Sequence, residues 1–251
     1  MKNRALLTFL LIIIGGICLH GQEKYNIKVS YKMMLNLVNY EEINSTLLCN
    51  NKQAFFKYKK EYKNDLEEES TDERGNLTYQ INIKDDTEYF IVSNLYGNSE
   101  ELKKGLGKKS YYIVEEVLPA IKWEITRETK KIGEYICFKA LARFRGRNYT
   151  AWFTPQVPVL FGPYKFHGLK GLILEIADDT KEVMFRAEKI EYVQLPIQKK
   201  DKKIKRVSKE FYKKKIHSFF DDLQRKLTSR GDRNIKIEVK TEIKTIEIEE
   251  N

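Results

Sequence analysis

The sequence holds few of the residues that build common catalytic and metal centres. It has three histidines and three cysteines in 251 residues, and only His167 and His217 lie beyond residue 21. A zinc site of several histidines is therefore excluded, although carboxylates could still bind calcium or magnesium. The sequence also lacks a CxxC pair, a GxSxG elbow, an HExxH motif, a Walker loop and a dinucleotide-binding glycine fingerprint. We therefore expect no cofactor, no metal and no catalytic site of these types.

Proline and glycine are also scarce. Five prolines and 13 glycines exclude a collagen-like or linker-like chain. Aromatic residues, by contrast, make up 12% of the sequence, which is too many for a disordered chain. At 29.7 kDa the chain is long enough to bury a core as one or two domains. The composition thus indicates a folded protein and leaves its function open.

The only long apolar run lies at the N-terminus. Lys2 and Arg4 precede apolar residues 5–19, and small and polar residues follow. This pattern predicts a secretory signal peptide over residues 1–21. The run is shorter than the roughly 20 residues that a membrane span needs, and the bulky Ile17 disfavours a lipid anchor at Cys18. We expect an exported protein that resides in the periplasm, associates with the outer membrane or leaves the cell.

Positive charge is concentrated in one segment. Removal of residues 1–21 lowers the formal net charge from +10 to +8, and residues 199–215, with ten basic and two acidic residues, account for that excess. Few aromatic residues interleave with these charges, so we expect no nucleic-acid partner. Two interpretations remain open: peripheral contact with an anionic membrane surface, and a solvated linker that leads into a helix.

Alternating apolar and polar residues predict about ten strands. The pattern is clear over residues 25–33, and residues 135–144 and 149–154 flank a typical hairpin turn at 145–148. Regular helices do not separate these strands, so a doubly wound α/β fold is disfavoured. We predict a mainly β (α+β) fold, in which a curved antiparallel sheet or partial β-barrel carries a C-terminal amphipathic helix over one face.

Two helical segments are expected. A cap-like pattern at 98–101 predicts a short helical turn that closes near Gly105. Ser208 is a plausible N-cap for a longer helix that ends near Gly231 and packs on the sheet. The apolar residues at helical spacing in this longer segment are Phe211, Ile216, Phe219, Phe220, Leu223 and Leu227.

We expect the chain to divide into three parts. The signal peptide over 1–21 precedes a β-rich domain over 22–196. Residues 197–251 then hold the basic linker, the amphipathic helix and a charged strand or tail. Cys49 and Cys137 are the cysteines that remain after cleavage, and the sequence leaves open whether they form a disulfide or are two small buried residues.

Residues 155–171 hold three prolines and three glycines and predict an irregular, rigid loop. In one interpretation it is a binding lip from which residues 164–167 project. In the other, Tyr164 and Phe166 fill the open end of the barrel while glycines permit close backbone packing. The structural residues of this loop are Pro155, Pro163, Gly168 and Gly171. The candidate ligand-binding residues are Trp123, Arg145, Arg147, Trp152, Tyr164, Lys165, Phe166 and His167.

The string TAWFTP at 150–155, followed by FGPYKFHGLKGLILEI at 161–176, is specific. It resembles the GLPGLI family, secreted proteins of Bacteroidota named after that hexapeptide. The resemblance covers about 25–195 in layout and 121–178 in detail. Lys170 stands where the family name has Pro, and the C-terminal Ile-Glu-Ile-Glu keeps only part of an Asn-Pro-Ile/Leu-Glu-like ending. The resemblance implies no activity, and its layout is similar to periplasmic lipoprotein carriers at the level of the fold alone.

Three functions remain open. The favoured one is a non-catalytic carrier that holds a lipid or hydrophobic peptide in an apolar half-barrel with loop 155–171 at its mouth. An alternative is an accessory protein of an outer-membrane transport or assembly system, which would expose an aromatic patch at Tyr164 and Phe166. A third is a hydrolase that uses Glu175 and Asp178 as its carboxylates.

Overall fold

The structure is a computed structural model that describes most of the chain beyond the expected signal peptide. The described residues are 23–37, 39–59, 67–71, 77–81, 88–106, 110–197, 202–230 and 246–247. The predicted signal peptide, the helix stop at Gly231 and residues 199–201 of the basic segment lie outside them. Within the described part, no helix is long and apolar enough to cross a membrane.

Strands dominate the described part of the chain. They are β1 (Lys24–Asn36), β2 (Tyr40–Cys49), β3 (Gln53–Lys59), β4 (Glu67–Thr71), β5 (Leu77–Ile81), β6 (Glu88–Asn94), β7 (Ser99–Gly105), β8 (Tyr111–Val117), β9 (Glu124–Ile132), β10 (Tyr135–Phe144), β11 (Arg147–Thr154), β12 (Leu172–Asp178), β13 (Val183–Pro196) and β14 (Lys205–Ser208), and the helix is α1 (Lys209–Arg230). The prediction of a mainly β fold with a C-terminal helix is confirmed.

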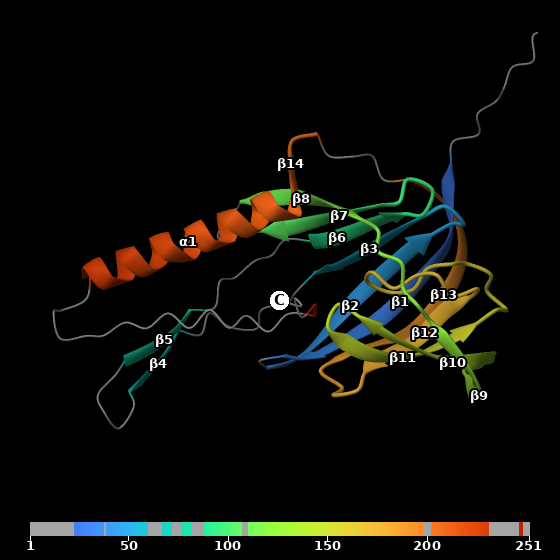
Figure 1. Ribbon diagram of the computed structural model, residues 1–251. Coiled ribbons are helices and arrows are strands. Elements are labelled where there is room, and N and C mark those ends of the chain that lie inside the picture. Colours follow the sequence, from blue (N-terminus) through green and yellow to red (C-terminus); the bar gives the residue numbers. More distant parts are fainter. Residues whose placement is uncertain are drawn as a thin grey trace, which may run out of the picture.

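Twelve of these strands form one sheet in the order β14-β8-β7-β6-β3-β2-β1-β13-β12-β11-β10-β9, and β4 pairs with β5 in a separate hairpin. Neighbours are antiparallel except for β14, which runs parallel to β8. The sheet curves strongly (Figure 1). Its two edge strands do not pair with each other in the described residues, so the sheet is open rather than a closed barrel.

Local sequence signals account for several of these strands. Alternate residues of β1 are buried from Tyr25 to Leu35, as the period of two requires. The β10–β11 hairpin turns through Arg145 and Gly146, whose φ angles are 49° and 78°. Two positive φ angles are typical of the type I′ turn, whose twist matches that of paired strands. The predicted hairpin is therefore confirmed.

The predicted helical turn after Asn98 is wrong. Residues Ser99–Gly105 form β7, which pairs with β6 on one side and β8 on the other. Glu100 and Leu102 are buried on the same face of this strand. Pairing with two neighbours thus outweighs the local cap-like pattern, because strand formation depends on context more than on local propensity.

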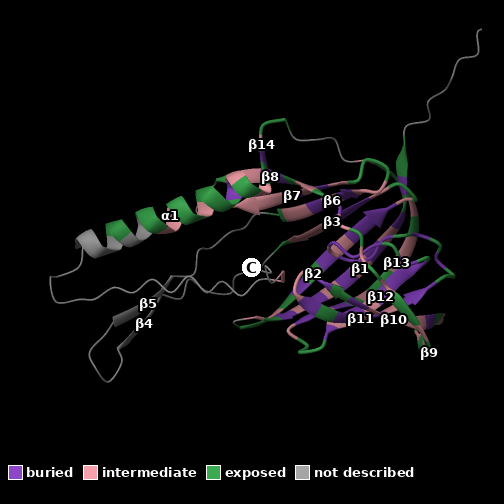
Figure 2. Cartoon of the chain, viewed as in Figure 1, coloured by how far each residue is buried: buried purple, intermediate pink, exposed green. Residues whose placement is uncertain are grey.

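Loop 155–171 packs against the core face of the curved sheet. Five of its apolar residues belong to the main core cluster: Val157, Val159, Phe161, Phe166 and Leu169. Buried residues run through both the loop and the strands behind it (Figure 2). A Cβ on Gly171 would lie 2.3 Å from the carbonyl oxygen of Thr154, so a side chain has no room there. The loop therefore fills the hollow of the sheet, with Phe166 buried and close backbone packing at Gly171.

The C-terminal helix starts as predicted but does not cover a sheet face. The Ser208 hydroxyl accepts a hydrogen bond from the backbone N–H of Phe211 at 3.2 Å, which is N-cap geometry. In the described residues its first turns contact the sheet edge at β8 and β14, where Tyr212 is buried and its hydroxyl donates to the carbonyl oxygen of Gly105 on β7 at 2.6 Å (Figure 1). Further along, Phe219 and Phe220 are partly exposed and contact each other. Because loop 155–171 already occupies the core face, the sheet edge remains for the helix.

Candidate functional site

The most unusual feature of the interior is a group of charged side chains from five separate segments. Glu100 lies on β7, Glu116 on β8, Arg145 in the β10–β11 turn, Lys165 in the 155–171 loop and Glu247 in the C-terminal segment. The side chains of Lys165 and Glu100 are both fully shielded from solvent. We call these five residues the charged cluster.

Lys165 is the centre of the charged cluster. Its Nζ lies 2.7 Å from Glu247 Oε1, 3.3 Å from Glu100 Oε2 and 3.4 Å from Glu116 Oε2. The charge of Lys165 is thereby compensated by three carboxylates, as a buried ammonium group requires.

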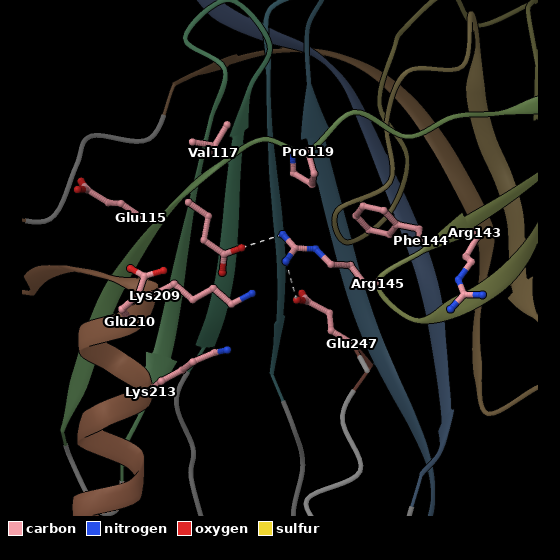
Figure 3. A pocket seen from close by; sticks show the side chains of 11 residues that line it. Glu115, Val117, Pro119, Arg143, Phe144, Arg145, Lys209, Glu210, Lys213 and Glu247 are labelled. Atoms are coloured by element: carbon pink, nitrogen blue, oxygen red, sulfur yellow. Dashed lines mark hydrogen bonds and ion pairs between the residues drawn. The ribbon is translucent and has the colours of Figure 1, made fainter. Parts of the chain in front are cut away.

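Arg145 holds the opposite side of the cluster. Its Nη2 donates to Glu116 Oε2 at 2.8 Å, and its Nη1 lies 3.8 Å from Glu247 Oε2 (Figure 3). The Tyr164 hydroxyl donates to Glu247 Oε1 at 2.9 Å. Glu247 therefore meets two cations and a hydroxyl donor at once.

The carboxyl groups of the cluster respond to this environment in opposite directions. Burial, reinforced by the charges of Glu116 and Glu247, raises the pKa of Glu100 to about 7 although Lys165 opposes the change. Burial would also raise the pKa of Glu247, but the charges of Lys165, Lys104 and Arg145 lower it to about 2. Glu247 is thus held as a carboxylate, whereas Glu100 changes its charge near neutral pH.

A pocket of about 850 Å³ opens beside the charged cluster (Figure 3). Its lining residues are Glu115, Glu116, Val117, Pro119, Arg143, Phe144, Arg145, Lys209, Glu210, Lys213 and Glu247. Within the described residues, Glu116 Oε1 and Arg145 Nε have no hydrogen-bond partner although both atoms are buried. The pocket wall thus combines side chains of both signs of charge.

A second ion network lies beside the charged cluster. Arg147 Nη1 donates to Asp178 Oδ2 at 2.6 Å and to Glu182 Oε2 at 2.8 Å. The other oxygen of Asp178 accepts from the backbone N–H of Val183 at 2.9 Å. These bonds tie β11 to the β12–β13 turn, so the predicted binding residue Arg147 has a structural role in the described fold.

The two carboxylates of the hydrolase hypothesis do not form a pair. Glu175 and Asp178 are three positions apart on β12 in a regular register, which places them on opposite faces of the sheet. Glu175 Oε1 instead accepts from Lys130 at 2.7 Å, and Asp178 is bound as described above. Joint acid–base work by these two groups is therefore contradicted.

A groove of about 620 Å³ with a mainly apolar lining lies at the other end of loop 155–171. Its lining residues are Ile121, Trp123, Ile125, Phe138, Phe153, Pro155, Gly168, Leu169 and Lys170. The Trp123 indole N–H donates to the carbonyl oxygen of His167 at 2.8 Å, which fixes the ring against the loop. We call this feature the apolar groove.

The structure separates the residues that the sequence grouped as a binding lip. Lys165, Phe166 and His167 are buried and Tyr164 is partly buried, so a projecting lip is wrong. Phe166 lies in the aromatic core, and burial lowers the pKa of the His167 imidazole. Trp152 is remote from this group and lies under Lys130, whose Nζ is 4.4 Å from the ring centroid.

The structural positions of the loop behave differently from one another. Pro155 and Gly168 line the apolar groove, and Gly168 adopts a φ of +94° that favours glycine. Pro163 is buried, and its carbonyl oxygen accepts from the backbone N–H of Phe166 at 3.1 Å.

The alternative of a disulfide between the two cysteines is not realised. Cys49 and Cys137 are both buried free thiols, on β2 and β10. Burial raises the pKa of Cys49 to about 12 and that of Cys137 to about 11, so both thiols are protonated at neutral pH. They behave as small buried residues, which is the other interpretation that the sequence allowed.

Sequence reasoning missed three members of the charged cluster: Glu100, Glu116 and Glu247. Glu100 and Glu116 each lie next to another glutamate, and Glu247 is one acid in the alternating Ile-Glu-Ile-Glu run, so each looks like an ordinary solvated acid in its own segment. No local pattern marks them, because the cluster exists only where the five segments meet.

Comparisons with known proteins agree with the fold and give no activity. A family model described as a protein of unknown function (Porph_ging) matches residues 143–175, which span the end of β10, the hairpin turn, β11, the loop and the start of β12. No curated protein matches the chain. The resemblance to the GLPGLI family and the meaning of Lys170 stay predictions.

Two solved structures of PNGF-II are similar in fold. The structure in space group P21 is 13% identical with a TM-score of 0.52 and is matched over 78% of this chain. The structure in space group C2 is 14% identical with a TM-score of 0.50, also over 78% of this chain. The chain spans about a third of the length of these structures, 34% and 33% respectively. At this identity the likeness shows a shared fold alone.

Proposed function

We propose that this chain is an exported, non-catalytic binding protein for an amphipathic ligand, and that the apolar groove is its ligand site. The observation that supports this proposal is the lining of the groove. Aromatic and aliphatic side chains surround a hollow of about 620 Å³, with one lysine among them. Small-molecule sites are typically hollows of about 300–1,000 Å³ with mostly apolar walls and a few polar groups. An acyl chain with an anionic end fits this combination, because Lys170 can meet the charge.

The groove replaces the interior of the sheet as the proposed site. Tyr164 stacks on Phe185 with ring centroids 6.2 Å apart, and Phe166 meets the same ring at 6.2 Å. These side chains fill the space that a ligand inside the half-barrel would need. If the chain acts as a carrier, it holds its ligand between loop 155–171 and strands β9–β11.

An accessory role in an outer-membrane system is the second candidate. This hypothesis places an exposed aromatic patch at Tyr164 and Phe166. Phe166 is buried and Tyr164 is partly buried, so these residues do not form such a patch. Exposed apolar residues on the outer strands, such as Ile125 and Ile136, are the surface that a protein partner would use instead. The exposed basic residues of α1 would in either case favour contact with an anionic membrane surface.

The test is binding of dodecanoate to the protein, produced by export to a bacterial periplasm and purified without detergent. Native mass spectrometry reports any ligand that is retained, and isothermal titration reports the affinity for added dodecanoate. Ile125 lines the groove and is 56% exposed, so Ile125→Glu should leave the fold intact. A buried apolar contact of this size is worth about 1.4 kcal/mol, so the variant should bind roughly tenfold more weakly.

Ile136→Glu is the matched control. Ile136 is also 56% exposed but is not part of the groove lining, so this variant should bind dodecanoate like the wild type. Absence of binding to the wild-type protein would refute the proposed site. Equal weakening by both substitutions would do the same, because it would reflect surface charge rather than the groove.

A further inference from the structure

The segment Ile246–Glu247 is held by the body of the protein in the way that a bound peptide is held. The carbonyl oxygen of Ile246 accepts from Arg147 Nε at 3.1 Å and from the Tyr149 hydroxyl at 3.5 Å. The Ile246 side chain packs against the main core cluster. Backbone, apolar side chain and carboxylate are thus all recognised within two residues.

The carboxylate of Glu247 receives the strongest of these contacts. Lys165 Nζ lies 2.7 Å and the Tyr164 hydroxyl 2.9 Å from its Oε1, while Arg145 approaches the other oxygen. All three donors come from the body of the protein and converge on one anionic group. Charge-assisted hydrogen bonds of this kind are the strong ones in a buried site.

The other charges of the cluster also favour an anion at the position of the Glu247 carboxylate. Without Glu247, the buried groups are the cations Arg145 and Lys165, with Lys104 nearby, against Glu100 and Glu116. An excess of positive charge would remain in a buried place, and a carboxylate neutralises it.

We infer that Arg145, Tyr164 and Lys165 form a receptor site for the glutamate of an extended Ile-Glu peptide, and that the chain's own Ile246–Glu247 occupies it as a tethered ligand. The site is separate from the apolar groove and does not depend on the proposed function. The pocket of about 850 Å³ beside Arg145 and Glu247 gives a bound peptide room to enter and leave.

Tethering explains why the site is filled in the isolated chain. A segment that belongs to the same chain as its receptor has a high effective concentration, so it outcompetes a free peptide of equal affinity. A free peptide should therefore bind well only when the tethered carboxylate is removed. The sequence places a second Ile-Glu pair at 248–249, two residues further on, which is the strand period.

The experiment uses the full chain with Glu247→Ala and Glu249→Ala together, so that a two-residue shift cannot refill the site. The probe is a fluorescein-labelled peptide with the sequence of residues 244–251, and fluorescence anisotropy measures its dissociation constant. We expect the double variant to bind the peptide at least about tenfold more tightly than the wild type. A control peptide with Gln at the positions of Glu247 and Glu249 should bind the double variant no more tightly than it binds the wild type.

Asp221→Ala with Asp222→Ala is the matched control variant, because it also removes two acidic side chains, both from the exposed surface of α1. It should bind the peptide like the wild type, whereas a gain there would show nonspecific attraction and overturn the inference. Failure of the double variant to bind the peptide, or equal binding of the Gln peptide, would also overturn it. If the double variant does not fold by circular dichroism, the isosteric pair Glu247→Gln and Glu249→Gln is measured against the same criteria.

Discussion

Two neighbouring residues of loop 155–171 enter different kinds of interior. Phe166 meets the rings of Phe144, Tyr149 and Phe185 at centroid distances of 5.7, 4.7 and 6.2 Å. Lys165 meets three carboxylates instead, and both side chains are almost completely buried. The loop therefore joins an aromatic core to the charged cluster through one peptide bond.

Burial alone therefore does not say how a residue contributes to the stability of the fold. Removal of apolar area from water stabilises a fold at any pH, in proportion to the area buried. Burial of charges costs free energy, and their mutual attraction compensates that cost only while each partner is present and ionised. The aromatic core should thus give constant stability, whereas the stability that the charged cluster gives should depend on pH and on occupancy.

The largest loss of stability is expected for Phe166→Ala. Loss of a buried phenylalanine leaves a cavity and should lower the free energy of unfolding by about 3–5 kcal/mol. Urea unfolding followed by circular dichroism at pH 5 and pH 7 should show the same loss at both values. Phe219→Ala on α1 is the control, because that ring is partly exposed and should cost less than about 1 kcal/mol. A loss that changes with pH would contradict the assignment of Phe166 to the apolar core.

The second is Lys165→Met. This change leaves the carboxylates of Glu100, Glu116 and Glu247 buried with Arg145 and the nearby Lys104 as the remaining cations, and should cost about 3–4 kcal/mol at pH 7. The same unfolding measurement at pH 5 should show a smaller loss, because protonation relieves the unpaired charges. Lys170→Met in the same loop is the exposed control and should have little effect. A loss equal at both pH values would place Lys165 with Phe166 as a packing residue.

The third is Glu247→Gln. The folded pKa of about 2 lies below the ordinary 4.5, so the wild-type carboxylate stabilises the fold above pH 4.5 and this contribution disappears as the pH falls toward 2. The shift corresponds to about 3 kcal/mol, which the variant should lack at pH 7. Urea unfolding from pH 2 to 7 should show the two proteins converge at the acidic end. Glu124→Gln, an exposed strand residue, should follow the wild type throughout.

The smallest expected effect is that of Glu100→Gln, and it has the opposite sign. The folded pKa of about 7 lies above 4.5, so ionisation of Glu100 destabilises the wild-type fold as the pH rises from 4.5 through 7. Between pH 5 and 7 the variant should gain about 2 kcal/mol relative to the wild type. Thermal unfolding at both pH values measures this difference. A relative loss in the variant over the same range would show that Glu100 is held as a stable carboxylate.

Local patterns predicted the elements whose residues decide their own conformation. Gly146 permits the positive φ angle that the hairpin turn needs, and Ser208 caps α1 because its hydroxyl lies within reach of the Phe211 N–H. The prediction of a helical turn after Asn98 was wrong for the converse reason. Those residues pair with β6 and β8, which are contacts that a local pattern does not contain.

The candidate sites divide in the same way. Trp123 lines the apolar groove as an aromatic residue can be expected to do, and it was among the predicted binding residues. The glutamates of the charged cluster were not among them, and the lip interpretation placed Lys165 at the surface. A buried charge is stable only with partners, and here the partners come from β7, β8, the β10–β11 turn and the C-terminal segment.

Local sequence patterns alone were enough to predict the strand-rich class, the hairpin, the irregular loop and the start of the C-terminal helix. The alternation of apolar residues, the residues that form turns and the residue that caps a helix each act over a few positions of the chain. Only the tertiary structure decided that the loop fills the sheet, that the helix lies at an edge and that five charged residues meet in the interior. These features depend on which distant segments compete for one surface and on charges that are stable only together, and both are properties of the assembled fold.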